Sequence, residues 1–282
     1  MNLLVRLARF VKIEHSVFAL PFAYMGMLWH AQPWPGWRVF GLLTLAMVMV
    51  RAFAMGINRI VDRHIDAQNP RTQNRELVTG ALSLPQAAGF VAGCAVLFVG
   101  ACAGLNTLCL ALAPCALAWS AFYSFTKRFT SACHVVLGSV LGLAPIAGWI
   151  AVAPEWHPAP VILGVAVALW VAGFDILYAC QDEDFDRQKG LHSIPADFGI
   201  PAALLVARLM HAVAAVLFAL AGWAAGAGWI YAAFVAVVGG VLWAEHRVVT
   251  PQDLSRVNLA FFTMNGCVAI ALAVGAVVDL LW

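Results

Sequence analysis

Long apolar runs alternate with short polar segments along almost the whole chain. Nine such runs are visible, bounded by charges or by Pro and Gly clusters: 15–32, 38–60, 85–104, 106–124, 132–152, 159–179, 200–223, 228–244 and 257–280. A helix that crosses a bilayer needs about 20 mostly apolar residues. The pattern therefore predicts an all-α polytopic membrane protein with nine transmembrane helices.

The composition agrees with this class. Of 282 residues, 63% are hydrophobic and only 11% are charged, which excludes an ordinary soluble domain. The formal net charge of +2 gives no indication of a nucleic-acid partner. The seven Cys residues form no C-x-x-C pair and are interpreted as small buried apolar residues. The basic N-terminal segment lacks a cleavage site, so we expect a cytoplasmic juxtamembrane helix there and no cleaved signal peptide.

The Lys and Arg residues predict how the chain is oriented in the membrane. Most of the 16 lie in segments on the same side of the predicted spans as the N-terminus, and Arg38 alone lies on the other side. The positive-inside rule then predicts a cytoplasmic N-terminus and a C-terminus outside. Most of the 11 Trp residues fall at the predicted outer ends of the spans, where amphipathic rings anchor.

Two acidic clusters interrupt this apolar background at the cytoplasmic ends of the second and sixth predicted spans. The first contains Asn58, Asp62 and Asp66, and the second ends with Asp182 and Asp186. The two Asp pairs have the same spacing of four residues and are offset by 120 residues. We expect one domain over residues 1–282, with a parallel half-repeat of spans one to four and five to eight, and span nine appended.

Residues four apart share a helix face, so Asn58, Asp62 and Asp66 are expected to form one polar stripe. Asp182 and Asp186 would do the same where the sixth helix extends past the membrane. Carboxylate and amide oxygens suit Mg²⁺, which keeps several waters and shares substrate phosphates. Two such sites facing each other would clamp a diphosphate.

Basic residues follow both acidic clusters and also occupy the loop between the fourth and fifth spans. They are Arg71, Arg75, Lys189, Lys127 and Arg128. Cations of this kind stabilise negative charge on a departing phosphate group. Each residue alone is equally well explained as a solvated surface charge. The joint pattern favours a site for a metal-bound diphosphate.

At these residues the chain resembles the UbiA superfamily of intramembrane prenyltransferases. The stripe N-x-x-x-D-x-x-x-D matches the family's second helix, and the D-x-x-x-D of Asp182 and Asp186 matches its sixth. Further matches to family motifs are Arg51, Arg71-Thr72, Arg75, Tyr123-Ser124, Lys127-Arg128, Asp175 and Tyr178. The resemblance extends over nearly the whole chain.

The resemblance implies a nine-helix bundle with a central cavity open to the cytoplasm and laterally to lipid. It also implies a polyprenyl diphosphate substrate, two bound Mg²⁺ ions and an aromatic acid acceptor. The segments 13–22 and 178–182 are most similar to the 4-hydroxybenzoate polyprenyltransferases, and within these to a bacterial form associated with menaquinone synthesis. Segment 13–22 lacks the Lys-Pro dipeptide of many ubiquinone-pathway members, which leaves the acceptor open. The implied location is the bacterial cytoplasmic (inner) membrane.

Residue by residue, the resemblance implies three groups of site residues. The metal ligands would be Asn58, Asp62, Asp66, Asp182 and Asp186. Substrate would contact Arg51, Arg71, Arg75, Lys189, Tyr123 and His15, with a structural role at the membrane interface as the alternative for His15. Catalytic roles would fall to Asp175, Lys127, Arg128 and Tyr178.

Several of these roles have alternatives. Asp175 is expected to act as a base or to orient the acceptor, with a third metal ligand or a structural hydrogen-bond acceptor as the alternatives. Arg51 would hold an acceptor carboxylate or the diphosphate, with an internal salt bridge as the alternative. Arg208, in the seventh span, is interpreted as structural.

Two other protein classes use similar residues. A secondary transporter also carries intramembrane acids and repeats, although its charges would lie near the midplane. A phosphatidyltransferase of the CDP-alcohol type also uses spaced aspartates with Mg²⁺, but its Asp-Gly-x-x-Ala-Arg core is absent here. Sibling enzymes that make haem O or chlorophyll remain alternatives within the superfamily.

Overall fold

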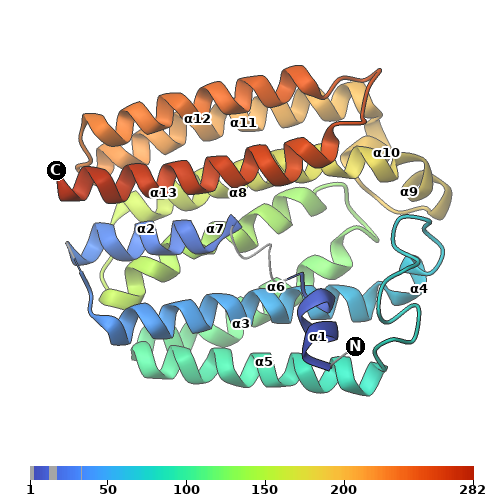
Figure 1. The fold of residues 1–282 in the computed structure, drawn as a ribbon, viewed down its shortest axis with the longest axis horizontal. Helices are drawn as coiled ribbons and strands as arrows, with labels where there is room; N and C mark the ends of the chain where they lie inside the picture. The colour runs from blue at the N-terminus through green and yellow to red at the C-terminus, as the bar shows by residue number, and fades with distance from the viewer. Residues whose placement is uncertain (1–2, 13–17, 33) are drawn as a thin grey trace. The chain divides into compact units, whose positions relative to one another are not determined.

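The computed structural model describes residues 3–12, 18–32 and 34–282, and the regular structure in these ranges is helical (Figure 1). The helices are α1 (Leu3–Phe10), α2 (Leu20–Ala31), α3 (Trp37–Val61), α4 (Arg63–Asp66), α5 (Leu84–Leu105), α6 (Thr107–Thr126), α7 (Cys133–Val152), α8 (Pro158–Ala179), η2 (Cys180–Asp182), α9 (Glu183–Lys189), α10 (Ile194–Phe198), α11 (Ile200–Ala224), α12 (Trp229–Val248), η3 (Leu259–Met264) and α13 (Asn265–Leu281). An all-α fold is therefore confirmed.

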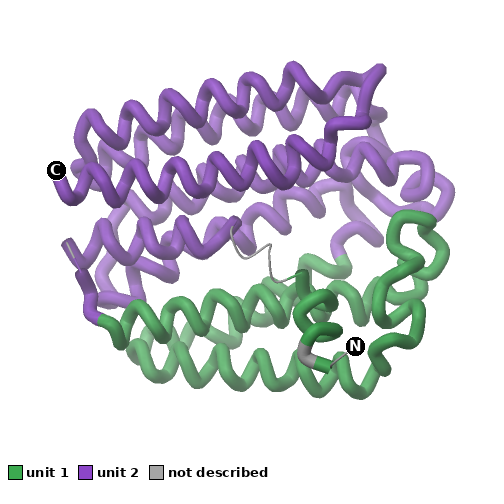
Figure 2. Tube along the Cα trace, in the orientation of Figure 1, with its two compact units in different colours: residues 1–16, 37–125 green, residues 17–36, 126–282 purple. Residues whose placement is uncertain are grey.

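The chain forms two compact units, coloured separately in Figure 2. The first contains residues 1–16 and 37–125, and the second contains residues 17–36 and 126–282. One acidic cluster belongs to each unit. The expected single domain with a parallel half-repeat stays a prediction.

In the first unit, α3 packs against α5, and their apolar core also contains Phe10, at the end of α1, and the next residue, Val11. Ala52, Ala87 and Val91 complete the contact from the two long helices. A β-carbon at Gly56 would overlap the side chain of Val91, so the glycine permits the close approach of α5. This packing fixes the end of α3 that carries Asn58.

In the second unit, α8 is the most buried long helix and packs against both α7 and α11. A β-carbon at Gly138 would overlap the carbonyl oxygen of Ala168 on α8, and one at Gly148 would overlap that of Ala23 on α2. Small residues at such contacts are typical of helices that pack within a membrane. The two glycines let the backbone of α7 approach the backbones of α8 and α2 closely.

Eight of the described helices are long and apolar enough to cross a membrane. They agree with the second to ninth expected spans to within a few residues, and the sixth continues through η2 and α9 to Lys189. The first expected span, 15–32, is not confirmed. In its described part, residues 18–32, the regular structure is the 12-residue helix α2. This helix has a proline in its first turn and is about 18 Å long, short of a bilayer core of about 30 Å.

Candidate functional site

Asn58, Asp62 and Asp66 form one polar stripe, as expected. The Asp62 N–H donates to the Asn58 carbonyl at 2.9 Å, and the Asp66 N–H donates to the Asp62 carbonyl at 2.8 Å. The helix is nevertheless broken at Asp62, whose φ of −89° and ψ of 2° separate α3 from α4. Asn58 Nδ2 donates to Asp62 Oδ2 at 2.9 Å, which leaves the Asn58 amide oxygen free to bind a cation.

Asp66 is buried and is held by the loop that follows α4. Arg75 Nη1 donates to Asp66 Oδ2 at 2.6 Å, and Thr72 Oγ1 donates to the Asp66 carbonyl at 3.1 Å. A charge-assisted bond this short is strong because the carboxylate is largely removed from water. The expected neighbourhood of Asp66 and Arg75 is therefore present in the fold, although the two residues lie nine positions apart.

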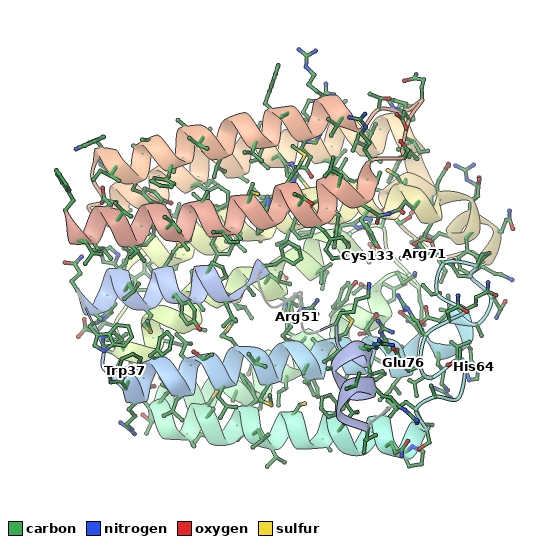
Figure 3. The ribbon with its side chains drawn as sticks, in the orientation of Figure 1. Trp37, Arg51, His64, Arg71, Glu76 and Cys133 are labelled. Atoms are coloured by element: carbon green, nitrogen blue, oxygen red, sulfur yellow. The ribbon has the colours of Figure 1, made fainter. Side chains whose placement is uncertain are left out.

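The same loop carries Arg71, whose backbone N–H donates to Asn69 Oδ1 at 2.9 Å. Figure 3 shows Arg71 and Glu76 in this loop. The base of the loop is tied to α3 by the ion pair between Arg59 Nη1 and Glu76 Oε2, which are 3.1 Å apart. A buried arginine thus fixes the loop from which Arg71 and Arg75 extend.

Arg51 lies on α3, seven residues before Asn58, so the two residues share a helix face about 10 Å apart. It is close enough to Tyr123 on α6 to interact with it electrostatically. In the described part of the chain no carboxylate pairs with Arg51, which does not support the internal salt bridge considered above. Figure 3 labels its place on the helix.

In the second unit, the acid pair lies where α8 gives way to a short 3-10 turn and then to α9. Asp182 ends the 3-10 turn, with a φ of −107° and a ψ of 6°. Asp186 follows one turn later and is buried. Lys127 Nζ lies 3.6 Å from Asp186 Oδ1, and this oxygen accepts no hydrogen bond from the described residues.

The basic residues expected near this pair lie in two different settings. Lys127 follows α6 directly, and its carbonyl accepts a hydrogen bond from the His192 N–H at 2.7 Å, which ties the two loops together. Arg128 beside it is half-buried. Lys189 is exposed at the end of α9, before Gly190 reverses the chain with a φ of 64°.

Asp175 on α8 pairs with His134 at the start of α7, with 2.8 Å between Oδ2 and Nδ1. The Ile194 N–H approaches the other ring nitrogen, Nε2, at 3.3 Å. Because Nε2 accepts, Nδ1 carries the ring proton and donates to Asp175. His134 did not emerge from the sequence, where a single histidine at the edge of an apolar run gives little signal.

Tyr178 lies one turn before the second acid pair, and its ring centroid is 4.3 Å from that of Phe261. Phe174 contacts Phe261 at 5.2 Å, and Trp170 contacts Phe174 at 5.0 Å. Rings at 170, 174 and 178 therefore form an aromatic stripe on one face of α8. His15, the remaining expected site residue, lies outside the described residues.

The donor atoms fit a hard divalent cation. Each unit contributes two carboxylates, and the first adds an amide oxygen, which is the oxygen-rich set that Mg²⁺ prefers. Within the described ranges, no group of three or more His, Cys, Asp or Glu side chains gathers at one point. An ion bound by either pair would therefore complete its shell with water and substrate oxygens.

The chain matches the UbiA prenyltransferase family over residues 19–267, and it belongs to that family. It is accordingly an enzyme that transfers prenyl groups. The sequence resemblance to the 4-hydroxybenzoate polyprenyltransferase branch is confirmed by curated relatives. The chain is 29% identical over 267 residues to the 4-hydroxybenzoate octaprenyltransferase of Citrobacter koseri, covering 94% of this chain and 92% of the relative.

Solved structures show the same fold. A UbiA homolog from Aeropyrum pernix K1 is 37% identical, with a TM-score of 0.86 over 95% of this chain and 98% of the other. A UbiA homolog from Archaeoglobus fulgidus, solved with DMAPP and Mg²⁺, is 20% identical, with a TM-score of 0.67 over 95% of this chain and 99% of the other. At 20% identity, the similarity to the Archaeoglobus fulgidus structure supports the fold only.

Proposed function

We propose that this enzyme transfers a polyprenyl group from polyprenyl diphosphate to an aromatic acid of the 4-hydroxybenzoate type, with Mg²⁺ as cofactor. The observation that carries the proposal is the repeated arrangement of acid and cation. In each unit a buried second Asp, Asp66 or Asp186, lies beside a basic side chain, Arg75 or Lys127. A carboxylate that binds a metal and a cation that binds phosphate are needed together at a diphosphate site.

In this proposal, Asn58, Asp62 and Asp66 hold one Mg²⁺, and Asp182 and Asp186 hold a second. When bound, the two ions neutralise the charge that develops on the diphosphate as the allylic bond breaks. The chemical precedent is the Archaeoglobus fulgidus homolog, which was solved with DMAPP and Mg²⁺. The curated relatives named 4-hydroxybenzoate octaprenyltransferase supply the acceptor class.

The basic side chains bind the diphosphate oxygens. Arg71, Arg75, Lys127, Arg128 and Lys189 supply this charge, and Arg51 with Tyr123 holds a substrate acid or phosphate oxygen. The aromatic stripe on α8 keeps water away from the allylic cation that forms. We assign the polyprenyl tail to the apolar interior of the membrane-spanning helices.

Asp175 acts on the acceptor. The His134 Nδ1–H donates to one of its carboxylate oxygens, which fixes the orientation of the other oxygen. The other oxygen of Asp175 can accept the ring proton after carbon attack, or can orient the phenol of the acceptor. Tyr178, one turn further along α8, acts on the acceptor at the same end of the site as Asp175.

The proposal includes location and topology. The enzyme lies in the bacterial cytoplasmic membrane, with the N-terminus and both acid pairs on the cytoplasmic side, where the soluble acceptor is available. Its product feeds ubiquinone or menaquinone synthesis. The distribution of Lys and Arg supports this orientation.

The acceptor can be tested directly in membranes that contain the protein. A labelled polyprenyl diphosphate is offered with 4-hydroxybenzoate, naphthoates and aminobenzoates in parallel reactions. We expect a carbon-prenylated product with a 4-hydroxybenzoate-type acid. Transfer only to a naphthoate would overturn the acceptor assignment, and transfer to none of the three would overturn the aromatic class.

A further inference from the structure

Outside the candidate site, the second unit has a hollow of ≈ 490 Å³ between α11 and α12. Its lining is divided along the helices. Arg208, His246 and Arg247 line one end, and small residues such as Ala215 and Gly239 line the other. Because α11 and α12 are joined by a short turn and run antiparallel, Arg208 lies level with His246 and Ala215 with Gly239. The basic and apolar ends are thus about 10 Å apart.

The two arginines have no carboxylate to neutralise them. Neither Arg208 nor Arg247 forms an ion pair or a hydrogen bond with the residues that the structure describes. The Arg247 guanidinium lies 4.7 Å from the ring centroid of Trp243, a contact that orients it and leaves its N–H donors available. Arg208 lies about 12 Å along α11 from its first residue, at a depth where a cation needs a counter-charge.

The floor of the hollow is a buried polar network. His211 Nε2 lies 3.1 Å from the Trp170 carbonyl, so that nitrogen carries the ring proton and donates. His211 Nδ1 then accepts from His246 Nε2 at 3.0 Å. In this arrangement Nδ1 of His246 carries no proton and can only accept a hydrogen bond, so the two arginines supply the N–H donors of the hollow. Beneath it, Asn265 Nδ2 donates to Glu245 Oε1 at 2.7 Å, which locks the floor in place.

The surroundings of the hollow are apolar and face outward. Leu209, Val213 and Val216 on α11 and Val237 on α12 are each about half exposed or more, as lipid-facing side chains are. A ligand here would meet two guanidinium groups at one end and a trough of small residues at the other. A free anion would bind to the guanidinium groups but would leave the trough of small residues empty.

We propose that this hollow binds the phosphate headgroup of an anionic phospholipid, with Arg208 and Arg247 around the phosphate and an acyl chain along Ala215 and Gly239. The site is separate from the acid pairs and does not depend on the proposed reaction. Bound lipid neutralises the two arginines and stabilises the contact between α11 and α12.

Native mass spectrometry of the full chain, released from detergent with defined lipids, tests the proposal. We expect wild type to retain phosphatidylglycerol in preference to phosphatidylcholine. The double variant Arg208→Gln/Arg247→Gln should bind phosphatidylglycerol about tenfold more weakly, because two charge-assisted contacts are lost. Arg256→Gln, which removes an exposed arginine outside the hollow, should bind as wild type does.

A second variant separates the lipid from other anions. Ala215→Leu keeps every charge but fills the trough, so it should also weaken phosphatidylglycerol binding. Inorganic phosphate should not displace the lipid at equal concentration. Equal retention of both lipids, unchanged binding in the double variant, or displacement by phosphate would each overturn the proposal. Arginine-dependent retention of farnesyl diphosphate in preference to phosphatidylglycerol would overturn the choice of lipid.

Discussion

Asp62 and Asp182, the first carboxylates of the two acid pairs, have nearly the same backbone conformation. Their φ and ψ values are −89° and 2° for Asp62, and −107° and 6° for Asp182. Both lie at a break between two helical segments, in a region of φ/ψ space that is sparsely populated and common at active sites. The two Asp pairs have the same spacing in the sequence. In the structure, the helix is also interrupted at the first Asp of each pair.

Both pairs should act on one diphosphate. Asp66→Asn and Asp186→Asn are each expected to lower kcat/KM about 10²-fold, since each weakens the charge that stabilises the leaving group. The double variant should lose less than the product of the two effects, because groups that act as a unit are not additive. Single-turnover rates of the four proteins measure the coupling. Full additivity would indicate that the pairs act on separate ligands.

Arg75 is expected to serve both folding and substrate binding. Arg75→Gln leaves a buried carboxylate at Asp66 without its cation, so the thermal midpoint should fall, and the KM for polyprenyl diphosphate should rise about tenfold. Arg187→Gln is the matched control. Its exposed pair with Glu183 contributes less than about 1 kcal/mol, so both quantities should stay near wild type. A lower midpoint with an unchanged KM would show that Arg75 is only structural.

His134 should position Asp175. His134→Leu removes the donor to Asp175 and is expected to lower kcat about 10²-fold, whereas His134→Asn keeps an N–H near that position and should recover part of the rate. Asp175→Asn should lose at least as much as His134→Leu. The control is His30→Gln, which removes a histidine from another pair, that with Glu155. The assignment fails if His134→Leu changes the rate no more than this control does.

Asn265 should be a main source of stability in the second unit. Trp170 Nε1 donates to its Oδ1 at 2.6 Å, and its Nδ2 donates to Glu245 and to the Ala260 carbonyl. Asn265→Ala leaves these buried groups without partners and should cost about 2–4 kcal/mol. Asn106→Ala, which removes a capping bond to the Cys109 N–H, should cost about 1 kcal/mol. Thermal midpoints in detergent compare the two, and equal shifts would contradict the network's role.

The long helices could be predicted because a bilayer sets a minimum length for an apolar run. The ends of α3, α5, α7 and α8 each lie within one residue of the expected spans. The first span stays unconfirmed, because α2 covers Leu20–Ala31 and part of the expected run 15–32 lies outside the described residues. Hydropathy predicts which segments avoid water, but it does not predict at which residue a helix begins within an apolar run.

The contacts of the site were harder to predict. The stripe of Asn58, Asp62 and Asp66 follows from helical periodicity alone, and it is present. The pair of Asp66 and Arg75 depends on the path of a loop, and the pair of His134 and Asp175 joins residues 41 positions apart on two helices. Such contacts arise from tertiary packing, for which one sequence carries no local signal.

The most direct test of the central claim is the dependence of prenyl transfer on Mg²⁺ in three matched variants. Transfer from a labelled polyprenyl diphosphate should stop with chelator and return with added Mg²⁺. Asp62→Asn and Asp182→Asn should each require more Mg²⁺ and lose at least about 10²-fold in rate at saturation, because each removes a ligand charge. Asp184→Asn, an exposed acid in the same segment, should behave as wild type. Equal rates and equal Mg²⁺ dependence in all three variants would contradict the claim that the two acid pairs bind a metal diphosphate.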